Sequence, residues 1–197
     1  MKTSLMLLSV ALWTACAAPA LDVPSTDDQI ASAILAAPEE YRAKAGVLGY
    51  DAQGKQVTLR EAENDLICSA DNPKREGFSV SCEHWELARY RARRSELRSQ
   101  GLSGEEPRAA LRKEIEDGKL PWTRAPRMRY RLHGTGFDTV SGQVTDPHPR
   151  WQIFVPYATP ESTGLSTESA WDTPWLMYAG TPLAHIMISP HPRNKQR

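Results

Sequence analysis

The middle of the chain repeats its apolar residues with the period of an α-helix. Over residues 83–100 an apolar stripe recurs every three or four positions, and Gly101 follows where a helix would stop. Ser103 and Glu106 then form a capping-box pattern, which begins a second helix that runs to about Asp117. The pattern therefore predicts a helical hairpin.

Alternating or continuous apolar runs on both sides of this hairpin predict short β-strands. Strict alternation over residues 127–132 places apolar side chains on one face and arginines on the other. The apolar run 151–155 predicts a central strand, and a helix is expected over 27–36. Further strands are expected at 47–50, 56–59, 66–70, 78–82, 174–178 and 184–188. The predicted fold class is α+β, an antiparallel sheet of short strands packed against the helical hairpin.

Two of the predicted strands carry the cysteines Cys68 and Cys82. A hairpin centred on Arg75 would place them directly opposite each other, close enough to form a disulfide. Such a bridge contributes about 3 kcal/mol in the chain-entropy account. A zinc site or a catalytic thiol is the alternative, but the sequence has no Cys-x-x-Cys motif and no nearby histidine pair. We therefore expect one structural disulfide.

Residues 1–20 have the composition of an export signal, with a lysine, an apolar run over 5–13 and small residues after it. The apolar run is too short to span a bilayer. Two cleavage positions remain open. Cleavage before Cys16 would make this residue the acylated start of a lipoprotein, whereas an ordinary signal peptidase would cut after Ala18 or Ala20. Either position predicts an extracytoplasmic protein, in the bacterial envelope (outer-membrane lipoprotein or periplasm) or secreted.

The remainder of the chain reads as one unit. Residues 21–190 are expected to form a single domain, and residues 191–197 a basic, frayed tail. The 24 basic and 24 acidic side chains balance, so there is no overall field that attracts nucleic acid. No motif indicates a cofactor or a metal. The predicted partner is the membrane, through a lipid on Cys16; any protein or small-molecule partner stays open.

Three segments resemble a group of exported bacterial proteins and lipoproteins that have no assigned activity. They are residues 46–51, residues 161–167 and the stretch from 174–177 through 181–187. The resemblance implies a single exported domain. It implies no reaction and no ligand-binding residues.

A hydrolytic site is one candidate for chemistry. Ser166 and His185 are residue types from which, with a carboxylate, a nucleophilic triad is built. The surrounding residues do not form a Gly-x-Ser-x-Gly motif, and a histidine among apolar neighbours is more often a core residue. The alternative therefore places a secreted hydrolase site between the 162–166 loop and His185.

An anion-binding face is the other candidate. Arg127, Arg129 and Arg131 share one face of a predicted strand, and Arg150 precedes a neighbouring one. Parallel guanidinium groups suit carboxylate and phosphate ligands. Acidic residues of the predicted helices are available to neutralise them, and the sequence favours this ordinary solvated surface over an anion-binding face. The sequence thus favours a non-enzymatic binding or accessory protein, with the hydrolase and the anion-binding module as alternatives.

Overall fold

The computed structural model describes residues 21–190 of the chain, so the proposed signal with Cys16 and the basic tail lie outside the described residues. The helices are α1 (Thr26–Ala33), the 3₁₀ helix η1 (Ile34–Ala36), α2 (Glu39–Arg42), α3 (Trp85–Ser99), α4 (Glu106–Glu116) and α5 (Pro160–Thr163). The strands are β1 (Gly46–Tyr50), β2 (Gln56–Arg60), β3 (Leu66–Ser69), β4 (Phe78–His84), β5 (Arg127–Gly134), β6 (Gly136–Asp138), β7 (Gln143–Thr145), β8 (His148–Phe154), β9 (Trp175–Met177) and β10 (His185–Ile188).

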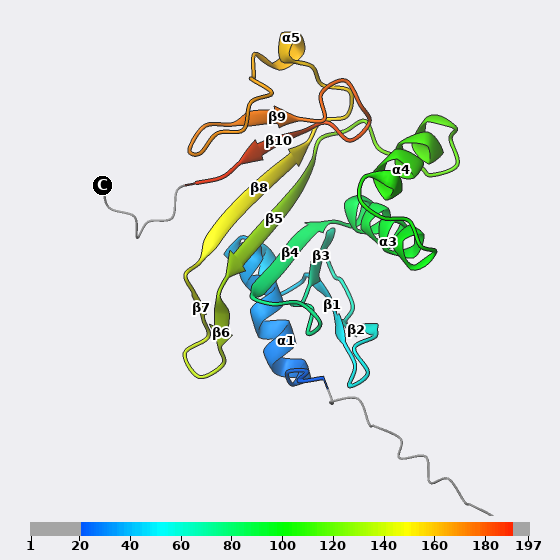
Figure 1. Cartoon of the computed structure of the whole chain (residues 1–197). Coiled ribbons are helices and arrows are strands. Elements are labelled where there is room, and N and C mark those ends of the chain that lie inside the picture. Colours follow the sequence, from blue (N-terminus) through cyan, green and yellow to red (C-terminus); the bar gives the residue numbers. More distant parts are fainter. Residues whose placement is uncertain (1–20, 191–197) are drawn as a thin grey trace, which may run out of the picture.

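Eight of the strands form one sheet in the order β2-β1-β3-β4-β5-β8-β10-β9 (Figure 1). Neighbouring strands run antiparallel, except that β1 pairs with β3 in parallel. Strands β6 and β7 form a separate two-stranded ladder, which continues the hairpin of β5 and β8 beyond the sheet. The predicted α+β class, with an antiparallel sheet and a helical hairpin, is confirmed.

One face of the sheet packs against α1 and encloses the disulfide. Cys68 and Cys82 are directly paired between β3 and β4 and are joined by the predicted bridge. The sulfur of Cys82 lies 3.4 Å from the carbonyl oxygen of Ala33 in α1. Around this contact, the buried core contains mainly small apolar residues: Ala33, Ala37, Ala45, Val47, Leu66 and Ala70. The disulfide therefore lies inside the α1 face.

Helix α1 is fixed to β1 by a side chain that satisfies backbone groups. The amide of Gln29 accepts a hydrogen bond from the Tyr50 nitrogen (2.8 Å) and donates one to the Tyr50 oxygen (3.0 Å). Gly49 permits this approach, since a Cβ there would lie 2.5 Å from the Gln29 oxygen. The helix begins at a Ser25 cap, whose hydroxyl accepts from the Asp28 nitrogen (3.1 Å).

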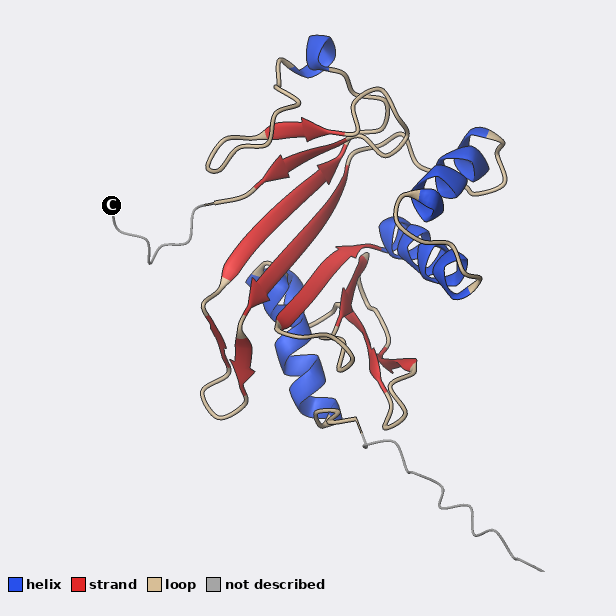
Figure 2. Ribbon diagram, viewed as in Figure 1, coloured by secondary structure: helices blue, strands red, loops and turns tan. Residues whose placement is uncertain are grey.

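The helical hairpin α3–α4 lies on the other side of the sheet, next to β3 and β4 (Figure 2). Side chains of β4 alternate between the faces, so Cys82 points to α1 whereas its neighbour Glu83 forms an ion pair with Arg91 of α3 (2.8 Å). Leu97 of α3 and Leu111 of α4 are buried against each other's helix. The charged strand face predicted from the sequence thus faces a helix.

Candidate functional site

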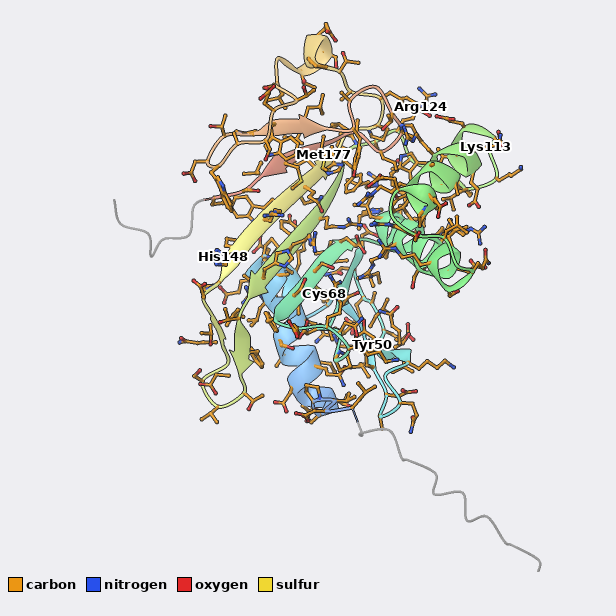
Figure 3. The ribbon with its side chains drawn as sticks, viewed as in Figure 1. Tyr50, Cys68, Lys113, Arg124, His148 and Met177 are labelled. Atoms are coloured by element: carbon orange, nitrogen blue, oxygen red, sulfur yellow. A yellow bond between two sulfur atoms is a disulfide. The ribbon has the colours of Figure 1, made fainter. Side chains whose placement is uncertain are left out.

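Two adjoining cavities lie between α3 and the charged face of the sheet. The outer cavity has a volume of about 540 Å³ and the inner one about 200 Å³. Both are lined by Tyr90, Arg94, Arg129 and Arg131, and we call the two together the groove. Tyr50, on the outer cavity, and Met177, on the inner one, mark its two ends (Figure 3). A volume in this range is typical of small-molecule sites.

Two of the three predicted arginines are neutralised by carboxylates. Arg127 donates to Glu86, and Arg129 donates to Glu83, which lies directly opposite it on β4. The Glu83 side chain is fully buried and also pairs with Arg91. These contacts hold α3 against the sheet, so Arg127 and Arg129 have a structural role at the groove.

Arg131 differs from its two neighbours, because no ion pair to it is present in residues 21–190. It faces Ser81 on β4 and Arg150 on β8, directly across the strands. Burial and the guanidinium groups of Arg129 and Arg150 lower the pKa of Arg131 to about 10. Like charges placed opposite each other destabilise a sheet. Repulsion between Arg131 and Arg150 therefore destabilises the fold, and a bound anion would remove this repulsion.

Two further cationic or proton-accepting groups face the same space. Burial, with the charges of Arg108 and Arg98, lowers the pKa of Arg94 on α3. Burial and the charge of Arg131 lower the pKa of His133 on β5 to about 4. The imidazole of His133 is consequently neutral near pH 7. Perturbed groups that converge on a cavity indicate a functional site.

Unpaired buried atoms also concentrate here. Four buried side-chain atoms within the described part of the chain have no hydrogen-bond partner, and three of them belong to residues that line the outer cavity: Ser69 Oγ, Arg94 Nε and His133 Nε2. The fourth, Glu83 Oε1, is compensated by its ion pair with Arg91. Buried polar atoms in folded proteins almost always have partners, so this convergence on one cavity points to a ligand that supplies them.

The predicted histidine of the hydrolase alternative, His185, is buried in the wall of the inner cavity. Its Nδ1 donates to the Leu183 carbonyl (2.8 Å), and its Nε2 accepts from the Gln152 amide (3.1 Å). Its ring stacks on Phe154 with centroids 4.7 Å apart. Burial lowers the pKa of His185 to about 4. Both nitrogens of the ring are thus occupied by structural hydrogen bonds.

The hydroxyl groups of the 162–166 segment form local turns. Ser162 donates to the carbonyl of Thr159 (3.0 Å), and Thr163 does the same (2.8 Å). The single turn of α5 is closed by a capping box, in which the Thr159 hydroxyl accepts from the Ser162 nitrogen (3.3 Å) and the Ser162 hydroxyl accepts from the Thr159 nitrogen (2.9 Å). The Ser166 hydroxyl accepts from the Glu168 nitrogen (2.9 Å). No hydrogen bond joins His185 to any of these serines and threonines in the part of the chain that the structure describes.

Two searches for other kinds of site gave no candidate within residues 21–190. No group of three or more histidine, cysteine or acidic side chains is arranged to hold a metal ion. No helix there combines the length and the hydropathy needed to cross a bilayer. The Cys68–Cys82 bridge, by contrast, indicates an oxidising, extracytoplasmic compartment.

The sequence pattern missed several residues of the groove. Continuing the alternation of β5 by two positions beyond Arg131 reaches His133, which lies on the same face. Ser69 and Ser81 gave no signal, because serine in a strand usually has no functional role and only their register reveals their place. Arg94 lies on the helical stripe predicted from the sequence, but its unpaired environment depends on the tertiary contacts of α3.

Comparison of the chain with protein-family models, with curated proteins and with solved structures finds no match.

Proposed function

We propose that this protein is a non-catalytic binding protein that captures an anionic ligand in the groove between α3 and the sheet. The observation that carries the proposal is the half-buried pair Arg131 and Arg150, which face each other across neighbouring strands and have no carboxylate partner among the described residues. Guanidinium groups in this arrangement supply parallel donors for a carboxylate or phosphate group.

The contrast with the other arginines of β5 supports this role. Arg127 and Arg129 lie on the same face, and each has a glutamate partner. If the face served only as a solvated surface, the third arginine would have no reason to remain uncompensated in a half-buried place. The unpaired Nε of Arg94, on the opposite wall, adds a donor from the helix side.

The place of action that we propose is the bacterial cell envelope. The export pattern of residues 1–20 and the disulfide both support passage across a membrane. If Cys16 is acylated, the domain is tethered to the membrane, and if cleavage follows Ala18 or Ala20, it is released. Intact mass measurement of the mature protein separates these two outcomes.

Isothermal titration calorimetry of the oxidised protein with phosphate, sulfate, acetate and citrate tests the binding function. We expect saturable binding of at least one of these anions, weakened by added salt because the attraction is between charges. Arg131→Gln should reduce the affinity at least about tenfold, the effect of losing a charge-assisted hydrogen bond.

Arg89→Gln is the matched control, since Arg89 lies on the exposed side of α3 and stacks over Trp85. Its affinity should equal that of the unchanged protein. Absence of binding for all four anions, or equal affinities of the Arg131→Gln and Arg89→Gln variants, would contradict the proposed function.

A further inference from the structure

The groove has two chemically different ends. The inner cavity is lined by Arg94, Arg108, Arg129, Arg131 and Arg150, and no acidic side chain of residues 21–190 lies in its wall. The outer cavity is also lined by arginines, among them Arg75, Arg91 and Arg98, but it adds hydroxyl and amide groups and the carboxylates of Asp71 and Glu76. A ligand that fills the groove therefore meets arginines without acidic side chains at the inner end, and arginines mixed with carboxylates and hydroxyl groups at the outer end.

Strand register places the two kinds of group in one row. Ser69 on β3, Ser81 on β4, Arg131 on β5 and Arg150 on β8 are successive cross-strand neighbours. Neighbouring strands lie about 4.8 Å apart, so the row extends for about 14 Å from the first serine to the last arginine. One phosphate or carboxylate group is too small to reach from the arginines to Ser69.

The hydroxyl end offers both donors and acceptors. The Ser69 hydroxyl is buried without a partner among the described residues, and the Asp71 carboxylate accepts a hydrogen bond from the Ser79 nitrogen (3.0 Å). Burial raises the pKa of Asp71, consistent with a carboxyl group that is partly removed from water. Arginines can only donate, whereas a ligand hydroxyl needs an acceptor as well, which Asp71 and the serines provide.

We infer that the ligand is an acidic sugar, a hydroxylated carbon skeleton that carries a carboxylate or phosphate group. This inference rests on the proposed anion-binding function and adds the neutral part of the ligand to it. The acid group lies between Arg131 and Arg150, and the sugar hydroxyls hydrogen-bond to Ser69, Ser81 and Asp71. The outer cavity, at about 540 Å³, has room for at least one sugar ring.

Calorimetry with matched ligands tests the inference on the oxidised protein. Glucuronate and glucose 6-phosphate carry the two possible acid groups, while glucose, acetate and phosphate each lack one half of the proposed ligand. We expect one of the acidic sugars to bind at least about tenfold more tightly than acetate or phosphate, and glucose to show no measurable binding. The tighter of the two identifies the acid group.

Ser69→Ala separates the sugar contacts from the anion contacts. The variant should lose about fivefold in affinity for the acidic sugar, the effect of one hydrogen bond, and retain its affinity for phosphate. Arg131→Gln should weaken both. Ser99→Ala, at the exposed end of α3, should change neither. Thermal unfolding without ligand checks that each variant is folded, and Ser81→Ala replaces Ser69→Ala if the latter does not fold.

The outcomes distinguish the inference from the function on which it rests. If phosphate or acetate binds as tightly as both acidic sugars, and Ser69→Ala changes no affinity, the acidic-sugar inference is overturned and the anion-binding function stands. If no anion binds, both are overturned. If glucose binds as tightly as glucuronate, the charge has no role and both are again overturned.

Discussion

The two faces of the sheet are built on opposite principles. On the α1 face, small apolar side chains and the disulfide fill the space, and the polar contacts that occur there are satisfied, as in the pairing of Gln29 with the Tyr50 backbone. On the groove face, charged side chains line a cavity, and buried atoms of Ser69, Arg94 and His133 lack partners.

This difference separates stability from function within one sheet. Each strand contributes to both faces, because successive side chains alternate. β4 illustrates this, since Cys82 joins the disulfide while its neighbour Glu83 holds two arginines of the groove. Substitutions on the α1 face should therefore lower stability, whereas substitutions of the unpaired groups should leave stability nearly unchanged and weaken binding. Glu83 is an exception on the groove face, because it is paired with two arginines and its substitution should lower stability.

The largest effect is expected for Glu83→Gln. Removing this fully buried charge leaves Arg91 and Arg129 uncompensated, which should lower the free energy of unfolding by about 3–4 kcal/mol. Urea denaturation measures the change. Glu96→Gln, in the exposed ion pair with Arg93, is the control and should cost less than about 1 kcal/mol. Equal effects of the two substitutions would show that Glu83 does not support the groove.

The next effect concerns the α1 face. Replacing Cys68 and Cys82 together by alanine should lower the free energy of unfolding by about 3 kcal/mol, because the unfolded chain regains the freedom that the bridge removes. Urea denaturation of the double variant, and of the unchanged protein with and without reductant, gives the value. A double variant as stable as the oxidised protein would contradict a structural role for the bridge.

A smaller effect depends on pH. The pKa of His185 falls from 6.5 in the unfolded chain to about 4 in the folded protein, because the side chain is buried. Between these values the unfolded chain binds a proton that the folded protein does not. The contribution of neutral His185 to the free energy of unfolding is therefore fully present above pH 6.5, and it decreases as the pH falls toward 4.

Between pH 7.5 and pH 5 this loss amounts to about 2 kcal/mol for His185. The measurement compares urea denaturation at the two pH values for the unchanged protein and for His185→Gln. The variant should lose less stability than the unchanged protein by that amount. An identical pH dependence of the two proteins would show that His185 is not held neutral by the fold.

The smallest effect on stability belongs to Arg150. Arg150→Gln removes one of two like charges that face each other, so the free energy of unfolding should stay the same or rise by less than about 1 kcal/mol, while anion affinity falls. Val80→Ala, on the α1 face, is the comparison variant. It should lower the free energy of unfolding by about 2 kcal/mol and leave the anion affinity unchanged. Denaturation and calorimetry on both variants test the separation of the faces directly.

Much of the architecture could be predicted from local patterns. The helical hairpin follows from the apolar period and its end signals, and α3 and α4 lie within one to three residues of the predicted limits. The pairing of Cys68 with Cys82 follows from a short hairpin whose register a turn can fix. The parallel pairing of β1 with β3 did not follow, since no local signal specifies contacts between strands that no tight turn joins. The β6–β7 ladder was not predicted either, although a turn over residues 139–142 joins its two strands.

The candidate site shows the same limit. Alternation over 127–132 placed Arg127, Arg129 and Arg131 on one face, and this is what the register shows. Which of them is neutralised depended on Glu83 and Glu86, which are more than 40 positions away in the chain. Glu83 reaches Arg129 through the pairing of β4 with β5, and Glu86 reaches Arg127 when α3 packs against the sheet.

The sequence by itself determined most of the elements in the sheet and the helical hairpin, the face that their strand residues occupy and the cysteine pairing, because these depend on neighbours a few positions apart. Only the tertiary structure decided that Arg127 and Arg129 are neutralised, while Arg131 and Arg150, beside a cavity, have no ion-pair partner within residues 21–190. The physical reason is that the state of a charge depends on the groups within a few ångströms of it, and these come from α3, β4 and β8, which are brought together by folding alone.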